Sequence, residues 1–158
     1  MIESPRIIQT EAQTAAVIHL TIPREDMQRV MGPSIAELMA AVSRQGLRPT
    51  GPLFAYHFRI SPDTFDFELG VPVNAPVIPV GRVRPSELPP ARVARTVYHG
   101  GYEGLGAAWG EFGKWIAGAG LKPAADLWEC YIAGPESNPD PATWRTELNR
   151  PLLDEAAA

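Results

Sequence analysis

The sequence contains almost no cysteine, no long apolar run and no N-terminal export signal. The single cysteine, Cys130, excludes an internal disulfide and a zinc site built from several cysteines. No stretch approaches the roughly 18 apolar residues that a membrane helix needs. The opening MIESPRIIQT lacks the apolar core of a signal peptide. We therefore expect a soluble, cytoplasmic protein that does not enter a membrane.

Basic residues are also too few for one large class of partners. The chain has 14 Lys and Arg against 18 Asp and Glu, and its net charge is −4. Proteins that bind nucleic acids carry clustered basic residues, and this chain has no such cluster. With 158 residues, 45% hydrophobic and 20% charged, the chain has the composition of one globular domain or of two small halves that share a core.

Common motifs of metal, nucleotide and hydrolase chemistry are missing. His19, His57 and His99 are widely separated and form no HxH or HExxH pair. There is no GxSxG elbow, and HGGYEGLG at 99–106 lacks the spacing and the lysine of phosphate-binding loops. We expect neither a metal nor a cofactor, and we interpret Cys130 as a buried small hydrophobe rather than a nucleophile.

The chain does contain an internal repeat. A shift of 74 residues aligns GPSIAELMAAVSRQGLRPTGPLF, which starts at Gly32, with GAAWGEFGKWIAGAGLKPAADLW, which starts at Gly106. Further along the chain the shift becomes 79, and Glu68 then aligns with Glu147. This period is too long for a solenoid, so two copies predict a domain with pseudo-twofold symmetry.

Both copies show the same order of predicted elements. A β-rich run, at 14–22 or 91–100, precedes an amphipathic helix whose apolar residues recur at three- and four-residue steps. Gly46 and Gly120 end the helices. Two strands joined by a turn follow, the first of them over 53–60 in the first copy. We predict a single α+β domain over 1–158 with two tandem β-α-β-β units: repeat one at about 14–75, a Pro-rich connector or edge strand at 76–90, and repeat two at about 91–153.

Glu129 is unusual because it lies in an otherwise apolar predicted strand at 127–134. Burying an unpaired carboxylate is costly. Strand side chains alternate, so we assign the flanking tryptophan and cysteine to the helix side, and Glu129 with Tyr131 to an open groove. Glu147 is also predicted to point away from the helix. The two carboxylates and the tyrosine would then form an acidic aromatic groove suited to cations.

A second interpretation is that Glu129 is solvated at the end of a sheet or paired with an arginine. The candidate partners are Arg59, Arg95 and Arg145. In the first copy Ala55 aligns with the glutamate and His57 with the tyrosine, so the carboxylate belongs to the second copy alone.

Three stretches, VYHGGYEGLGAAWGEFGKWIAGAGL, LWECY and PDPATWRTELNRPL, resemble the GyrI-like small-molecule-binding domain. This domain is the effector-binding module of multidrug-responsive AraC-type and MerR-type transcription activators, and it also occurs alone as a gyrase-inhibitor-like protein. The resemblance extends over essentially the whole chain, more loosely in the first copy. It implies two tandem β-α-β-β units in the SHS2 arrangement, around a central cleft that binds drug-like, often cationic or aromatic, compounds near a central glutamate.

Glu129 in WECY matches the central glutamate, and Glu147 matches a second acidic position. The resemblance places Tyr98, Trp109 and Tyr131 among the cleft aromatics. The complete set of candidate ligand-binding residues is Glu129, Tyr131, Trp109, Tyr98, His57 and Glu147.

The two repeats use almost the whole sequence and leave no helix-turn-helix, so we do not expect direct DNA binding. The main hypothesis is a small-molecule ligand, a xenobiotic that the protein sequesters or reports to a partner. The resemblance implies an alternative, a hydrolase of strained cyclopropane-bearing toxins, with Glu129 as general acid or base and Tyr98 or Tyr131 as its helper. A third hypothesis is a protein partner, gyrase or a regulator, bound through an exposed surface.

Overall fold

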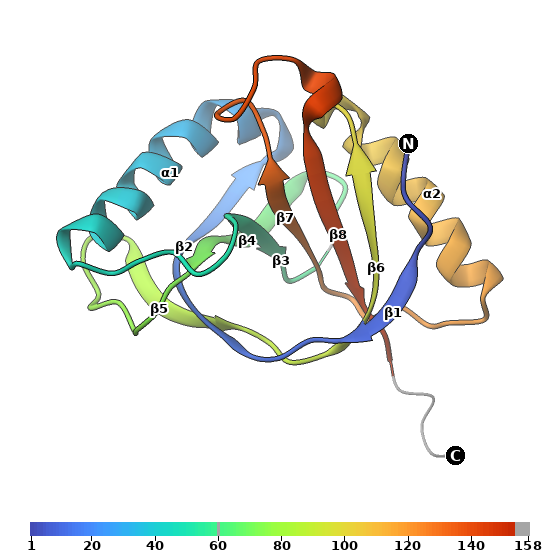
Figure 1. Ribbon diagram of the computed structural model, residues 1–158, viewed down its shortest axis with the longest axis horizontal. Coiled ribbons are helices and arrows are strands. Elements are labelled where there is room, and N and C mark those ends of the chain that lie inside the picture. Colours follow the sequence, from blue (N-terminus) through green and yellow to red (C-terminus); the bar gives the residue numbers. More distant parts are fainter. Residues whose placement is uncertain (60, 154–158) are drawn as a thin grey trace. The chain divides into compact units, whose positions relative to one another are not determined.

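The computed structural model describes residues 1–59 and 61–153, which form two compact units (Figure 1). Unit 1 contains Met1–Thr10 and the chain from Ala91 onward, and unit 2 contains Glu11–Pro90. Within the described residues each unit has four antiparallel strands and one α-helix, which confirms the predicted α+β class. The repeat boundaries and the SHS2 arrangement around a cleft stay predictions.

Unit 1 has the strand order β1-β6-β8-β7, and α2 lies alongside this sheet (Figure 1). Its elements are β1 (Arg6–Gln9), β6 (Arg92–His99), η2 (Tyr102–Gly104), α2 (Leu105–Gly118), β7 (Leu127–Ala133), η3 (Pro141–Thr143) and β8 (Arg145–Pro151). Strand β1 was not predicted. Its four residues pair with β6, from Arg6 opposite Arg95 to Gln9 opposite Arg92.

Unit 2 has the strand order β3-β4-β2-β5. Its elements are β2 (Gln13–Pro23), η1 (Arg24–Asp26), α1 (Met27–Arg44), β3 (Phe54–His57), β4 (Thr64–Pro72) and β5 (Val83–Leu88). Strand β5 lies within the Pro-rich connector and pairs with β2. The predicted strand over 53–60 is observed as the shorter β3, and Ile60 lies outside the described residues.

Both helices end where the sequence predicts. Gly46 follows α1 with φ of 70°, and Gly120 follows α2 with φ of 73°. Only glycine adopts this backbone conformation readily. In each unit the residue after the glycine donates its N–H to a carbonyl in the last helical turn over 3.1 Å. These caps fix the direction in which the chain leaves each helix toward β3 or β7.

The core of unit 1 lies between α2 and one face of its sheet. Ala108, Phe112 and Ile116 are buried along one side of the helix and belong to the same cluster as Ala94 of β6 and Leu148 of β8. Burying a side chain such as phenylalanine or isoleucine stabilises the fold by about 2 kcal/mol. The helix is therefore anchored at three successive turns, which fixes the position of every other side chain it carries.

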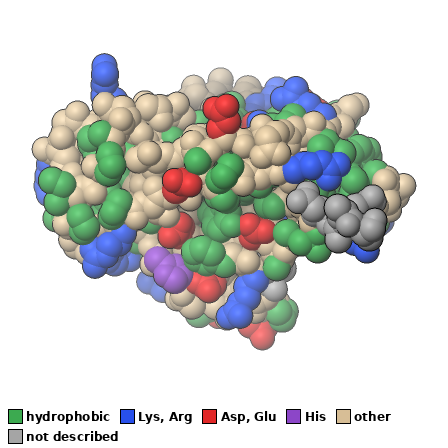
Figure 2. Space-filling view, turned by 90° about the horizontal axis from the view of Figure 1, so that it is seen from below, with side chains coloured by type: hydrophobic (Ala, Val, Ile, Leu, Met, Phe, Trp, Pro, Cys, Tyr) green, Lys and Arg blue, Asp and Glu red, His purple; other side chains and the backbone are tan. Residues whose placement is uncertain are grey.

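Two further observations concern the helices and the basic side chains. Of the helices in the described part of the chain, none is long and apolar enough to cross a membrane. On the face shown in Figure 2, the described lysine and arginine side chains stand apart and do not gather into one continuous patch.

Candidate ligand-binding site

The register of β7 and β8 determines which face of the sheet Glu129 occupies. Glu129 lies directly opposite Leu148, and opposite residues of antiparallel strands project to the same face. Leu148 packs in the core beneath α2, so Glu129 also lies on the helix-covered face. The predicted assignment of faces was therefore wrong, and Trp128 and Cys130 lie on the other side. Both faces of β7 carry apolar side chains, so alternation alone did not reveal which one meets the helix.

Two uncharged donors hold the Glu129 carboxylate. Trp109 of α2 donates its Nε1–H to Oε2 over 2.7 Å, and the Tyr131 hydroxyl donates to Oε1 over 2.9 Å. Glu129 and Tyr131 are both only partly buried. None of the ion pairs among the described residues includes Glu129. The hydrogen bonds therefore fix the carboxylate in place while no cation matches its charge.

Burial dominates the protonation behaviour of this pair. It raises the pKa of Glu129 above its ordinary value, while the hydrogen bonds from Trp109 and Tyr131 act in the opposite direction. Burial and the neighbouring Glu129 charge raise the pKa of Tyr131 well above its usual range. The tyrosine therefore remains a hydrogen-bond donor. The carboxylate is more basic than an exposed glutamate and still receives two donors.

Two further aromatic residues extend the site beyond the candidates found in the sequence. The Tyr102 ring, in η2, makes a T-shaped contact with the Tyr131 ring, with centroids 5.9 Å apart, and its centroid lies 5.0 Å from that of the Trp144 ring. Tyr102 is 38% exposed. In HGGYEGLG the glycines are more conspicuous than Tyr102. The missed signal was that Tyr102 lies in the turn that leads into α2, the helix that carries Trp109.

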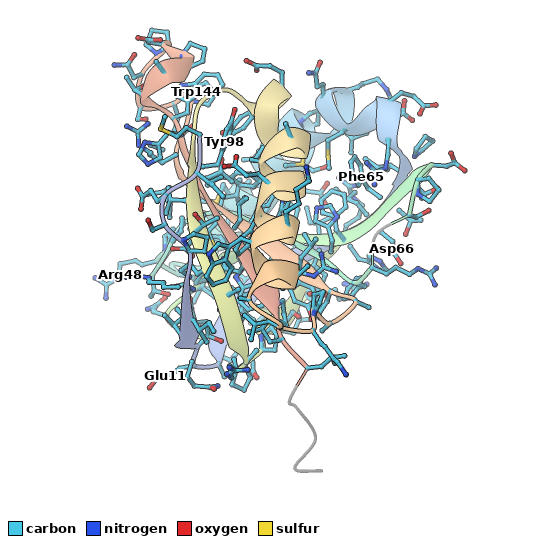
Figure 3. All side chains as sticks on the ribbon, turned by 90° about the vertical axis from the view of Figure 1, so that its right-hand side faces the viewer. Glu11, Arg48, Phe65, Asp66, Tyr98 and Trp144 are labelled. Atoms are coloured by element: carbon cyan, nitrogen blue, oxygen red, sulfur yellow. The ribbon has the colours of Figure 1, made fainter. Side chains whose placement is uncertain are left out.

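Tyr98 has a different environment from these residues. It is 7% exposed, packs in the core of unit 1 and donates its hydroxyl to the Gly101 carbonyl over 2.9 Å. Figure 3 shows Tyr98 beside the upper part of α2, and Trp144 above Tyr98 in that view. A Cβ atom at Gly104 would lie 2.0 Å from the Tyr98 hydroxyl oxygen. The glycine therefore provides room for a core tyrosine, whose hydroxyl is bonded to backbone rather than to Glu129.

Glu147 lies on the face of the sheet opposite to Glu129. It is directly across from Cys130 in the register, forms an ion pair with Arg95 at 3.3 Å, and accepts a hydrogen bond from Asn149 over 3.2 Å. The prediction of one groove shared by both carboxylates was therefore wrong. Burial raises the pKa of Cys130 to about 12, which keeps its thiol protonated.

His57 belongs to an aromatic cluster within unit 2. Its ring stacks on Phe67 at 4.9 Å and meets the edge of Phe65 at 5.4 Å. It is 5% exposed, and its buried Nδ1 has no hydrogen-bond partner. Burial, with a smaller contribution from the Arg24 charge, lowers the pKa of His57 to about 4. The imidazole is therefore neutral at physiological pH.

The chemistry available around Glu129 is that of one carboxylate, two tyrosine hydroxyls and several ring faces. Such groups bind cations through charge pairing and cation–π contact, and they bind flat apolar molecules through ring contacts. In residues 1–59 and 61–153, no group of three or more His, Cys, Asp or Glu side chains is placed to hold a metal ion.

Solved structures share this fold over almost the whole chain. The C-terminal domain of EcmrR aligns with a TM-score of 0.84 and 20% identity, over 95% of this chain and 97% of that one. In the EcmrR–DNA complex the TM-score is 0.82 with 19% identity, and the match covers 94% of this chain but 57% of the EcmrR chain. This chain therefore spans little more than half of the longer EcmrR chain.

Two other structures are more distant. SAV2435 bound to tetraphenylphosphonium has a TM-score of 0.67 and 12% identity, over 96% of this chain and 95% of that one. A hydrolase from Listeria innocua has the same TM-score and identity, over 94% and 91% of the two chains. At these identities the likeness concerns the fold alone. Among curated protein sequences none matches significantly. The profile of the GyrI-like small molecule binding domain, however, matches residues 3–152, and the chain belongs to this family.

Proposed function

We propose that the protein binds lipophilic aromatic cations, of the kind found among xenobiotics, at Glu129 in unit 1. The observation that carries the proposal is the Glu129 carboxylate itself, which is partly buried and held by Trp109 and Tyr131 without a matching cation. A carboxylate in such a place attracts a positive charge, and the surrounding rings favour a cation that is large and apolar.

The relatives support the same chemistry. Tetraphenylphosphonium, which is bound in the SAV2435 structure, combines one positive charge with four phenyl rings. Small-molecule binding is the property that names the whole family. We extend the cation preference to this chain because its own site presents a carboxylate among aromatic rings.

A titration with tetraphenylphosphonium tests the proposal directly. All four tryptophans, at positions 109, 115, 128 and 144, lie in unit 1, so intrinsic fluorescence reports on this unit. We expect saturable quenching in the native protein. Glu129→Gln should weaken binding about tenfold or more, because a hydrogen-bonded charge is replaced by a neutral amide. Glu111→Gln, which alters an exposed carboxylate of α2, is the matched control.

The pH dependence of this binding identifies the responsible group. The charge of tetraphenylphosphonium does not titrate, so any loss of affinity at low pH reports on the protein. Affinity should fall as pH decreases through the raised pKa of Glu129, and this dependence should disappear in Glu129→Gln. If Glu129→Gln binds as tightly as the native protein while remaining folded by circular dichroism, the proposal is wrong.

A second candidate function is hydrolysis of a strained cyclopropane, with Glu129 as general base. The raised pKa of Glu129 and its contact with the Tyr131 hydroxyl favour it. Glu129 would take a proton from water as the water oxygen bonds to one ring carbon. The ring C–C bond breaks, its electron pair passes to the other carbon and its electron-withdrawing substituent, and that carbon then takes a proton. Tyr98 is a weaker helper than Tyr131, because its hydroxyl is already bonded to Gly101.

An electron-poor cyclopropane separates this candidate from binding alone. Mass spectrometry should show addition of one water at a rate that depends on protein concentration and disappears in Glu129→Gln. If the substrate stays unchanged in the presence of saturating protein, hydrolysis is refuted and ligand binding is the remaining proposed function. A protein partner such as gyrase or a regulator, and a cytoplasmic location, stay predictions.

A further inference from the structure

The aromatic lining of unit 1 continues outward from Glu129 through Tyr131 and Tyr102 to Trp144. The proposed function does not use Glu136, which lies near the Tyr102 hydroxyl. The Tyr131 hydroxyl bonds to Glu129, the Tyr131 ring meets Tyr102, and the Tyr102 ring meets Trp144. Tyr102 is one of the most exposed large rings of the described chain at 38%. A ligand that occupies the Glu129 site therefore has a second aromatic surface within reach.

Trp144 is held firmly at this outer position. Its Nε1–H donates to the Asn138 carbonyl over 2.7 Å, and its backbone N–H donates to the Pro141 carbonyl over 3.1 Å. Its own carbonyl accepts from Gly100 over 3.2 Å, which connects it to the segment that leads into η2. A ring that is fixed before binding loses little conformational entropy when a ligand arrives.

A second carboxylate accompanies these rings. The Tyr102 hydroxyl oxygen and a carboxylate oxygen of Glu136 lie 2.6 Å and 2.9 Å from the point where a Gly134 Cβ would be. Neither group has a hydrogen bond or an ion pair with another side chain in the described ranges. Arg145 directs its guanidinium to the Ala142 and Trp144 carbonyls, so its charge is engaged with backbone.

Two carboxylates, Glu136 and Glu129, act on the Tyr102 hydroxyl. Burial, Glu136 and Glu129 together raise the pKa of Tyr102, so the hydroxyl keeps its proton. A cation placed against the ring would interact favourably with the ring face and with Glu136. At a partly exposed position, a cation–π contact and an ion pair each strengthen binding by about two- to fivefold.

We propose that Tyr102, Trp144 and Glu136 form a second cation subsite, and that the preferred ligands carry two positive charges, one at Glu129 and one against the Tyr102 ring. This inference rests on the proposed function, because it adds a second subsite to the Glu129 site. It makes Glu136 a specificity-determining residue for ligands with two charges, with little effect on ligands that carry one.

Matched pairs of ligands test the subsite. Hexamethonium carries a trimethylammonium group at each end of a hexane chain, and hexyltrimethylammonium carries only one; decamethonium and decyltrimethylammonium form a longer pair. Isothermal titration calorimetry should show that, in at least one pair, the dication binds about fivefold more tightly than the monocation. Glu136→Gln and Tyr102→Leu should remove that preference. Tyr102→Phe should retain most of it, because the ring remains.

The controls separate the two proposals. Glu111→Gln should keep the preference for dications. Glu129→Gln should weaken the binding of dications and monocations by a similar factor. If monocations and tetraphenylphosphonium bind but neither pair shows a preference, or the preference survives in Glu136→Gln, the subsite is refuted and the proposed function stands. If no cation binds at Glu129, both are refuted. Added salt should reduce the dication preference, because the extra contact includes an exposed charge pair.

Discussion

The buried imidazole of unit 2 predicts a specific acid sensitivity of the fold. His57 is 5% exposed, and burial lowers its pKa from the ordinary 6.5 to about 4. Its charged form is therefore disfavoured in the folded state, while the unfolded chain binds a proton readily. Stability from this group is fully present above about pH 6.5 and is lost progressively as pH falls toward 4. At about pH 4.5 the loss should reach about 2.5 kcal/mol.

The variant His57→Phe isolates this effect. Phenylalanine keeps an aromatic ring against Phe67 and Phe65 but cannot take up a proton. Urea unfolding is followed by far-UV circular dichroism, because the tryptophans lie in unit 1 and His57 lies in unit 2. Between about pH 7.5 and about pH 4.5, the free energy of unfolding of the variant should rise relative to that of the native protein by about 2.5 kcal/mol.

Phe65→Leu disturbs the same cluster without removing a titratable group, so its stability relative to the native protein should stay constant across that pH range. A constant difference between the native protein and His57→Phe would show that folding does not lower the pKa of the imidazole, and the reasoning from burial would be wrong.

Four other changes test individual features of unit 1. Trp109→Phe removes one donor from the central carboxylate and should weaken tetraphenylphosphonium binding by about threefold to tenfold in a fluorescence titration. Gly104→Ala brings a Cβ atom within 2.0 Å of the Tyr98 hydroxyl and should lower the free energy of unfolding by about 2 kcal/mol, partly restored when Tyr98→Phe is added. Gly120→Ala places a side chain at φ of 73° and should cost about 1 kcal/mol in urea unfolding. Gly118→Ala, with open space around its Cβ position, should stabilise by about 0.5 kcal/mol.

The helical part of the fold could be read from the sequence because its signals are local. Apolar residues at three- and four-residue steps marked the buried stripe of α2, and glycines at 46 and 120 marked both helix ends. Strand β1 could not be found in this way. Its four residues, RIIQ, show no long alternation, and it is a strand only because it pairs with β6, which is remote in sequence.

The site was identified only in part, because some of its signals are local in the sequence and others depend on contacts between distant residues. Glu129 was conspicuous as a carboxylate among apolar residues, strand alternation placed Tyr131 on its face, and the family resemblance supplied Trp109. Trp109 and Tyr131 both donate hydrogen bonds to Glu129. The face of β7 was assigned wrongly because that decision depends on register with Leu148, which a single strand does not encode. Tyr102 was missed because its role comes from ring contacts with residues distant in sequence.

The pairing of β1 with β6 makes unit 1 discontinuous in sequence, with the whole of unit 2 inserted after residue 10. During synthesis the contiguous segment Glu11–Pro90 is complete long before the last strands of unit 1 emerge. The first ten residues therefore stay unpaired until β6 has been synthesised, and closing such a long loop slows folding. Deleting them would bare the outer edge of β6, and an unpaired edge invites strand exchange between copies. Truncation at the N-terminus is therefore expected to yield aggregates before it alters any binding property.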